Sequence, residues 1–297
     1  MHRVRLELPF TPPLEPSNLY GHLAATAVPG VEEWRDGAYR AAVRLAGGPA
    51  IVAVRLPVGA VVPVELLLTD AADLEDAVAR VRRLLDLDLE PDAASAVLAA
   101  DPVLAPLVAA VPGRRVPGTL DPPAMALRAV LGQQIATAAA RTITGRLVAA
   151  LGEPIADPDG GLAALFPAPA ALVADIARAG EVLRMPDARR RTVLAVAAAL
   201  ARGALDLAAD PPAVRAALLE VPGVGPWTAD TVRMRALGDA DAFLAGDLGV
   251  VLAARRLGLP ARPGPLERHS RAWSPYRAHA VQYLWATGEH AVNTLPR

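Results

Sequence analysis

Residues 218–247 read LLEVPGVGPWTADTVRMRALGDADAFLAGD, a pattern of two helices joined by a glycine-rich hairpin. A short amphipathic helix is expected before VPGVG, and a second helix is expected to begin at Pro226, because Pro suits the first turn of a helix. Gly223 and Gly225 free the backbone to turn tightly and let another backbone come close. The hairpin amides and the following helix N-terminus then form an anion site suited to a nucleic-acid phosphate. Asp247 follows at the start of a third expected helix.

The composition limits the class of protein. The chain has 297 residues and 53% hydrophobic content, which is enough for about two domains. No apolar run is long enough to span a bilayer, and the N-terminus has no signal-peptide pattern. We therefore expect a cytoplasmic protein with no membrane partner.

Two residue types are absent from the chain. There is no Cys, which excludes disulfides, thiolate zinc sites and Cys-ligated iron–sulfur clusters. All 30 basic residues are Arg, so there is no Lys. Schiff-base chemistry on a side-chain amine is therefore excluded.

Charge is distributed unevenly along the chain, although the net charge is only −1. Residues 1–112 hold 9 Arg and 15 acidic residues, whereas residues 181–297 hold 15 Arg and 11 acidic residues. Contact with phosphates, if it occurs, is expected in the C-terminal two-thirds. Ordinary surface variation explains the same asymmetry equally well.

The first part of the chain is expected to form an antiparallel sheet with a helix. Short β-branched or alternating runs separated by Gly and Pro fill residues 1–69. A helix is expected over Asp70–Leu87, where apolar residues recur at helical spacing. A segment rich in Pro and Gly around Pro112–Pro123 indicates a boundary, which gives domains over residues 1–112 and 113–297.

The second part is expected to be helical throughout. Repeated Pro or Asp starts and Gly stops fit the preferences of helix ends. The expected helices are Pro123–Leu151, Ala168–Ala179, Pro186–Arg202, a hairpin pair within Pro211–Leu237, Asp247–Leu257 and Pro275–Thr287.

Several segments carry a family resemblance in addition to the hairpin at about 218–237. They are LRAVLGQQIATAAARTITGRL (127–147), LRMPDARRRTVLAVAAAL (183–200), WSPYRAHAVQYLW (273–285) and, near the N-terminus, YRAAVRL (39–45). In this order the chain resembles the AlkA-type 3-methyladenine DNA glycosylase II family of the helix-hairpin-helix DNA glycosylase superfamily. The resemblance implies an α+β protein. An N-terminal antiparallel-sheet α/β domain would precede an all-helical glycosylase core of two subdomains around a cleft.

The resemblance also implies a function. It is hydrolysis of the N-glycosidic bond of alkylated bases, 3-methyladenine and related, in double-stranded DNA, as a step of base excision repair. A base inside the duplex must be flipped into a pocket before it is cut out. With no Lys, the chain is expected to be monofunctional and without lyase activity. Two alternatives stay open: a non-catalytic helix-hairpin-helix module that binds DNA or lesions, and a glycosylase of the same fold with another lesion preference.

Asp247 is the expected catalytic residue. A fixed carboxylate stabilises the cationic sugar that develops as the bond breaks, or it orients the attacking water. An Asp before an apolar run also commonly caps a helix, and both roles can coexist. By resemblance Trp227 and Trp285 belong to the base pocket, although each is also a plausible core residue. Thr231 stands where the family tends to have Tyr, which leaves the range of accepted bases open.

The remaining expected contacts concern DNA and a cation. The DNA-binding hairpin comprises Val221, Gly223, Val224, Gly225 and Trp227. By resemblance, hairpin backbone carbonyls bind a structural Na⁺ or K⁺ whose ligands the sequence leaves undetermined, and no other cofactor is expected. Gln134 is the candidate for the residue that fills the gap left by the flipped base, where the family often has an apolar wedge. A monomer is expected.

Overall fold

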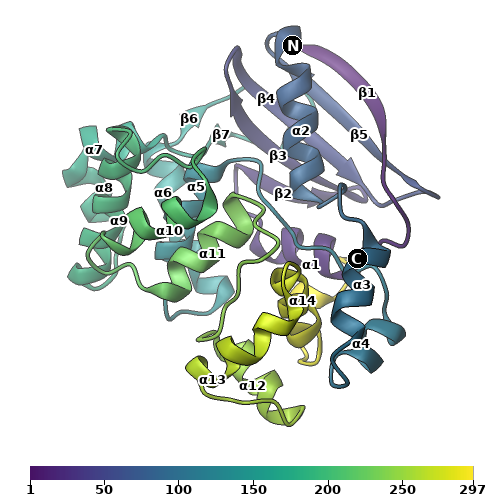
Figure 1. Cartoon of the computed structure of the whole chain (residues 1–297). Helices are drawn as coiled ribbons and strands as arrows, with labels where there is room; N and C mark the ends of the chain where they lie inside the picture. Colours follow the sequence, from purple (N-terminus) through teal and green to yellow (C-terminus); the bar gives the residue numbers. More distant parts are fainter. Residues whose placement is uncertain (297) are drawn as a thin grey trace.

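The structure, a computed structural model, describes residues 1–296. Its N-terminal part is a five-stranded antiparallel sheet in the order β1-β5-β4-β3-β2 (Figure 1). The strands are β1 (His2–Pro9), β2 (Glu32–Arg35), β3 (Ala38–Leu45), β4 (Gly48–Arg55) and β5 (Val61–Leu68). Side chains alternate between the two faces of a strand, so Val62, Val64, Leu66 and Leu68 of β5 point together into one core.

Helix α2 (Leu74–Leu84) lies across this sheet (Figure 1). Its buried residues Ala77, Val81 and Leu84 share the cluster of β5, which explains their helical spacing in the sequence. The expected helix begins as a 3₁₀ turn, η1 (Ala71–Asp73), which Asp70 caps by accepting a hydrogen bond from the Ala72 amide.

The rest of the chain is almost entirely helical. The elements outside the sheet and α2 are α1 (Ser17–Thr26), α3 (Pro91–Ala99), α4 (Ala105–Ala110), α5 (Pro122–Leu131), α6 (Thr137–Leu151), β6 (Glu153–Pro154), β7 (Ala164–Leu165), α7 (Pro169–Ala174), α8 (Ile176–Val182), α9 (Asp187–Ala201), α10 (Pro211–Leu219), α11 (Pro226–Ala236), α12 (Leu248–Arg256), α13 (Pro263–His269), η2 (Ser270–Trp273), α14 (Arg277–Ala286) and η3 (Ala291–Asn293). A sheet followed by helices confirms the expected α+β class.

Two expected helices are broken, which corrects the sequence prediction. The helix expected over Pro123–Leu151 is split into α5 and α6, because Gln134 between them takes a left-handed φ of 56°. The helix expected over Ala168–Ala179 is split at Asp175, whose side chain caps α8 by accepting a hydrogen bond from the Arg178 amide. Helices α1, α3, α4 and α13 lie where the sequence indicated none.

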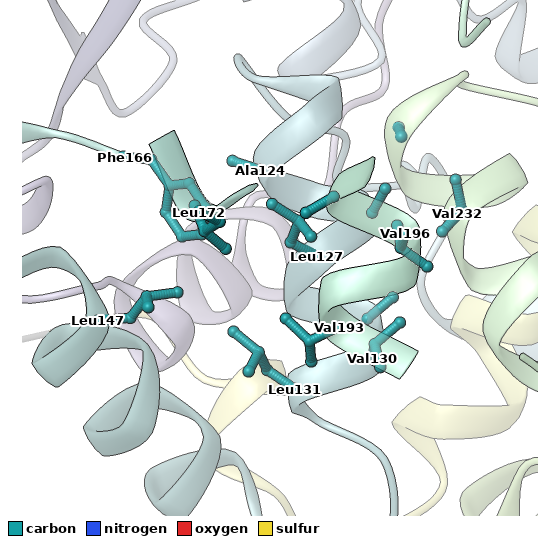
Figure 2. Close-up of a cluster of buried hydrophobic side chains, with 14 of the residues drawn as sticks. Ala124, Leu127, Val130, Leu131, Leu147, Phe166, Leu172, Val193, Val196 and Val232 are labelled. Carbon is teal, nitrogen blue, oxygen red and sulfur yellow. The ribbon is translucent and has the colours of Figure 1, made fainter. Parts of the chain in front are cut away.

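The helices pack around two separate hydrophobic clusters. The first surrounds α5, whose Leu127, Val130 and Leu131 are fully buried against α9 and α11 (Figure 2). The second joins α11, α12 and α14 with Leu98 of α3 and Val108 of α4. Helices α3 and α4 therefore pack with the C-terminal helices, although they precede residue 112 in the sequence.

Among residues 1–296, no helix combines the length and the apolar character needed to cross a bilayer.

Candidate active site

The Asp247 carboxylate lies at the centre of the site. Trp227 donates a hydrogen bond from its indole Nε1 to Oδ2 of Asp247 over 2.9 Å, and Trp285 donates from Nε1 to Oδ1 over 2.7 Å. The Val250 amide also donates to Oδ1 over 3.0 Å, so Asp247 is the N-cap of α12. The two roles considered for Asp247, helix cap and site carboxylate, therefore coexist in geometry. A carboxylate held by three donors from three helices has a fixed position.

Gly249 makes this close approach possible. A Cβ atom at Gly249 would lie 2.9 Å from Cδ1 of Trp285 and 3.1 Å from Oδ1 of Asp247. Only a residue without a side chain leaves room there for the indole to reach the carboxylate. The sequence pattern did not single out this glycine.

Asp247 opens into a cavity of about 580 Å³ between α1 and the two groups of helices. Trp227, Thr231 and Trp285 line it together with Asp247, so the structure brings these four expected residues together. The Thr231 hydroxyl donates to the Trp227 carbonyl oxygen over 2.7 Å, so the hydroxyl hydrogen is bonded to the backbone of α11. The part played by α1, through Asn18 and His22, was not expected from the sequence.

Basic side chains in the cavity wall were also missed, and three of them have a shifted pKa. Arg235 is 5% exposed, and burial lowers its pKa to about 10 against the opposing effect of Asp247. Burial also lowers the pKa of Arg128, but Glu32, Tyr39 and Asp121 together outweigh this and raise the pKa overall. Burial, with the positive charges of Arg235 and Arg128, holds the pKa of His22 well below its ordinary value, so His22 is neutral at neutral pH.

A second hollow lies on the sheet face opposite α2. It is lined by Arg3, Arg5, Arg40 and Glu65 among others. Arg3 and Arg5 both pair with Glu65, and Arg40 pairs with Asp157. Because these charges neutralise one another, the hollow does not compete with the Asp247 cavity as a site.

The turn of the hairpin between α10 and α11, at residues 221–225, lies outside the cavity lining and presents free amides. Val224 donates its amide to the Val221 carbonyl oxygen over 3.0 Å, which closes the turn, and Gly223 takes a left-handed φ of 88°. No hydrogen bond from the amides of Gly223, Gly225 or Trp227 is found in residues 1–296. A Cβ at Gly225 would meet nothing within 4 Å, so its backbone is open to an approaching group. This geometry suits an anion.

Neighbouring helices hold the hairpin from behind. The Thr192 hydroxyl donates to the Pro222 carbonyl oxygen over 3.0 Å. Gln133 donates from Nε2 to the Gly223 carbonyl oxygen over 3.1 Å and to the Thr228 hydroxyl over 2.9 Å. These two carbonyls are therefore occupied by protein donors.

Two other hairpin carbonyls could serve a cation. Among the described residues, no hydrogen bond reaches the carbonyl oxygens of Leu219 or Val224. Backbone carbonyl oxygens are ligands that hard cations accept. Whether these two oxygens hold a monovalent cation stays a prediction.

Gln134, the wedge candidate, is exposed on the α5–α6 loop and does not line the cavity. Its neighbours Ile135 and Thr137 do line it, so Gln134 is close to the cavity mouth in sequence and in space. Gln133, which the sequence left without a role, is the residue that joins this loop to the hairpin.

The chain is similar to known DNA repair proteins. The AlkA N-terminal domain family matches residues 5–121. The chain is 50% identical over 99% of its length to a Mycobacterium tuberculosis protein described as a probable bifunctional transcriptional activator/DNA repair enzyme AlkA, and it spans 59% of that relative. It is 29% identical to the Escherichia coli DNA-3-methyladenine glycosylase 2 over 94% of the chain and 96% of that protein. The fold is similar to that of 3-methyladenine DNA-glycosylase from Archaeoglobus fulgidus, with a TM-score of 0.81, 20% identity, and 95% of this chain and 97% of the other covered.

Proposed function

Since the chain belongs to the AlkA-type group of the helix-hairpin-helix DNA glycosylases, we propose that it hydrolyses the N-glycosidic bond of alkylated bases in double-stranded DNA. The observation that carries this proposal is the Asp247 carboxylate, held by two indoles at the wall of a cavity. The substrates proposed are 3-methyladenine and related lesions, as the name of the E. coli relative suggests. The wider reaction sequence is base excision repair.

The cavity supports a mechanism with base flipping. Its volume of about 580 Å³ is within the range of sites for small organic groups. A base inside duplex DNA cannot reach Asp247, so the nucleotide rotates out of the stack and its base enters the cavity. Trp227 and Trp285 offer aromatic surface against which the base is held.

Asp247 supplies negative charge where positive charge develops. As the base leaves, the sugar becomes an oxocarbenium-like cation, and a fixed carboxylate beside it lowers the energy of that state. The indole donors from Trp227 and Trp285 and the Val250 amide fix both carboxylate oxygens before the substrate arrives. This preorganisation means that no rearrangement of the carboxylate is needed during bond cleavage.

The hairpin is proposed to hold the DNA backbone. The free amides of Gly223, Gly225 and Trp227 accept a phosphate in this proposal. The Leu219 and Val224 carbonyls would hold Na⁺ or K⁺, which would add positive charge next to the phosphate. Gln134 is proposed to enter the gap left by the base.

The protein is further proposed to be monofunctional and monomeric. Glycosylases that also cut the strand need an amine nucleophile, and this chain contains no Lys. Water is then the acceptor of the sugar, and the product is an intact strand with an abasic site.

The experiment that tests the function compares wild type with Asp247→Asn on duplexes containing 3-methyladenine. Asn is as good an N-cap as Asp, so α12 is preserved while the negative charge is lost. Base release is expected to fall at least about a hundredfold, with DNA binding retained. Strands are expected to break only after heating in alkali, because the chain has no Lys side chain to cleave them.

A matched control is Asp210→Asn. Asp210 caps α10 by accepting a hydrogen bond from the Ala213 amide, and it is exposed and outside the cavity. The Asp210→Asn variant should retain full activity. If wild type binds damaged DNA yet releases no base, the chain is either a binding module or specific for another lesion, and the proposed function is wrong.

A further inference from the structure

The side chain of Gln133 connects the α5–α6 loop, residues 132–136, to the hairpin between α10 and α11. Its Nε2 donates one hydrogen bond to the Gly223 carbonyl oxygen over 3.1 Å and a second to the Thr228 hydroxyl over 2.9 Å. A carbonyl oxygen only accepts, so the NH2 end of the amide faces the hairpin. Because Thr228 belongs to the first turn of α11, one side chain joins the loop to the turn of the hairpin and to the helix that follows it.

Within residues 1–296, the other hydrogen bonds of this loop stay local. They join residues 132–136 to α5 or α6, the helices that flank the loop. Gln134, the next residue, has a left-handed φ of 56°, a conformation that costs energy for a residue with a side chain. The surroundings must therefore hold the loop in this conformation, and the bonds of Gln133 supply that hold.

The loop borders the cavity that contains Asp247. Ile135 and Thr137 line the cavity, and Gln134 is exposed beside them. A duplex whose phosphate is held by the hairpin amides meets this loop at a distance that the Gln133 side chain determines. A residue that fills the gap in the base stack keeps the flipped base out of the duplex, so its position affects the rate of base release.

We propose that Gln133 is a positioning residue, which fixes the loop that carries Gln134 relative to the phosphate-binding hairpin. Gln133 does not line the cavity, so it acts through these two neighbours and not on the base itself. This inference rests on the proposed function. It follows that Gln133 contributes to the steps after DNA is bound, and contributes little to the binding of an undamaged duplex.

The test separates binding from the later steps. Single-turnover release from a duplex with 3-methyladenine, at saturating protein, measures the later steps, and fluorescence anisotropy with undamaged duplex measures binding. Gln133→Met keeps an unbranched chain of similar reach without an N–H donor, and Gln133→Asn keeps the amide on a chain one methylene shorter. Both should lower the saturated rate roughly tenfold and change the affinity for undamaged duplex by less than about threefold.

Thr192→Ala is the matched control. The Thr192 hydroxyl also donates to a hairpin carbonyl oxygen, that of Pro222, but it does so from α9, and no hydrogen bond of Thr192 to the α5–α6 loop is found within residues 1–296. This variant loosens the hairpin alone. It should weaken binding to undamaged duplex and leave the saturated rate within about twofold of wild type, because the loop keeps its link. Urea unfolding of each variant checks that it is folded.

A double-mutant cycle identifies the residue through which Gln133 acts. Gln134→Ala alone should slow base release. In the Gln133→Met background the loop is already misplaced, so Gln134→Ala should have little further effect, and the combined loss should be smaller than the product of the single losses. If Gln133 only stabilised the fold, the two losses would be independent and would multiply.

Each outcome supports or overturns the inference. An unchanged saturated rate in Gln133→Met and Gln133→Asn overturns it and leaves the proposed function intact. Equal changes of rate and affinity in the Gln133 and Thr192 variants also overturn it, because Gln133 would then serve only to stabilise the hairpin. Losses that multiply in the cycle overturn the positioning of Gln134. Failure of wild type to release 3-methyladenine overturns the proposed function and the inference with it.

Discussion

Gly249 shows how one missing side chain determines the geometry of the site. It is the second residue of α12, and its hydrogen atom faces the edge of the Trp285 indole. The indole must pass this point to donate to Asp247 over 2.7 Å. The hydrogen bond between Trp285 and Asp247 therefore depends on the absence of a side chain at Gly249 as well as on the two partners.

We predict that Gly249→Ala slows base release by roughly ten- to a hundredfold. The added Cβ would displace the Trp285 indole, and a small displacement of a group in the active site is enough to lose that much rate. The added Cβ would stand 2.9 Å from Cδ1 of Trp285, which is too close for the indole to stay in place. Single-turnover release on the 3-methyladenine duplex measures the effect, and a binding titration on an abasic duplex should change little.

Gly264→Ala is the matched control at this scale. Gly264 is also the second residue of a helix, α13, and a Cβ there meets only Nη1 of Arg268 at 3.8 Å. The activity of the Gly264→Ala variant should equal that of wild type. Equal rates in Gly249→Ala and wild type would show that the distance between Trp285 and Asp247 does not limit the reaction.

At the scale of elements, the two hairpin glycines serve different purposes. A Cβ at Gly223 would lie 2.0 Å from the Thr192 hydroxyl, and its φ of 88° is left-handed, so Gly223 is needed for folding. Gly225 has an extended backbone, with φ −101° and ψ 176°, and open space around it. A side chain at Gly225 would therefore meet no other part of the described chain.

We predict that Gly225→Ala weakens DNA binding about tenfold while it costs at most about 1 kcal/mol of stability, the difference between Gly and Ala as N-cap. Gly223→Ala should instead destabilise the protein by several kcal/mol, roughly 2–4, through strain and the clash with Thr192. Fluorescence anisotropy with undamaged duplex and urea unfolding separate the two effects. Loss of stability in Gly225→Ala with unchanged DNA binding would contradict the assignment of its amide to a phosphate.

Elements with strong local signals were predicted well from the sequence. Helices α9, α10, α11, α12 and α14 lie within a few residues of the expected ranges, because Pro, Asp and Gly mark their ends. The break between α5 and α6 was missed. Gln133 and Gln134 have no special preference for a loop, and the loop is held by the hydrogen bonds of Gln133 to the hairpin, which is about 90 residues away.

The site residues also divide into those with a signal in the sequence and those that depend on distant contacts. Asp247 carried a local signal, the Asp that precedes an apolar run, and Trp227 and Trp285 were assigned through the family resemblance. Arg235 and Gly249 carried no signal, since each meets Trp285 only in the folded chain. The Gln134, hairpin and cation assignments stay predictions until DNA binding is measured.

At the scale of the whole molecule, Asp101 ties the segment between α3 and α4 to the C-terminal helices. Its Oδ2 accepts hydrogen bonds from the Trp273 indole over 2.7 Å and from Nε2 of His269 over 2.8 Å. Its Oδ1 accepts from the Val103 amide over 2.8 Å. Trp273 is fully buried, so its N–H has no access to water if this partner is lost.

We predict that Asp101→Ala lowers the free energy of unfolding by about 2–4 kcal/mol, because it leaves buried donors unpaired. Urea unfolding measures the loss. Asp88→Ala removes a 68% exposed carboxylate that pairs with Arg82, and it should cost less than about 1 kcal/mol. Equal losses in the two variants would show that the Asp101 contacts do not hold the parts of the molecule together.

The same contacts give a pH dependence. Burial raises the pKa of Asp101, but the hydrogen bonds from Trp273, Val103 and His269 outweigh it and lower the pKa overall. The unfolded chain therefore takes up a proton first as pH falls, and the stabilising contribution is lost progressively below about pH 4. The difference in stability between wild type and Asp101→Ala should therefore shrink as the pH falls below about 4.

The walls of the cavity come from residues that are far apart in the order of synthesis. His22 on α1 and Arg128 on α5 face Trp285 on α14, and α1 also packs against η3 at residues 291–293. A ribosome therefore has to pass residue 293 before this cavity is complete. Under the proposed function, a nascent or truncated chain has no complete chamber for a flipped base and so releases none.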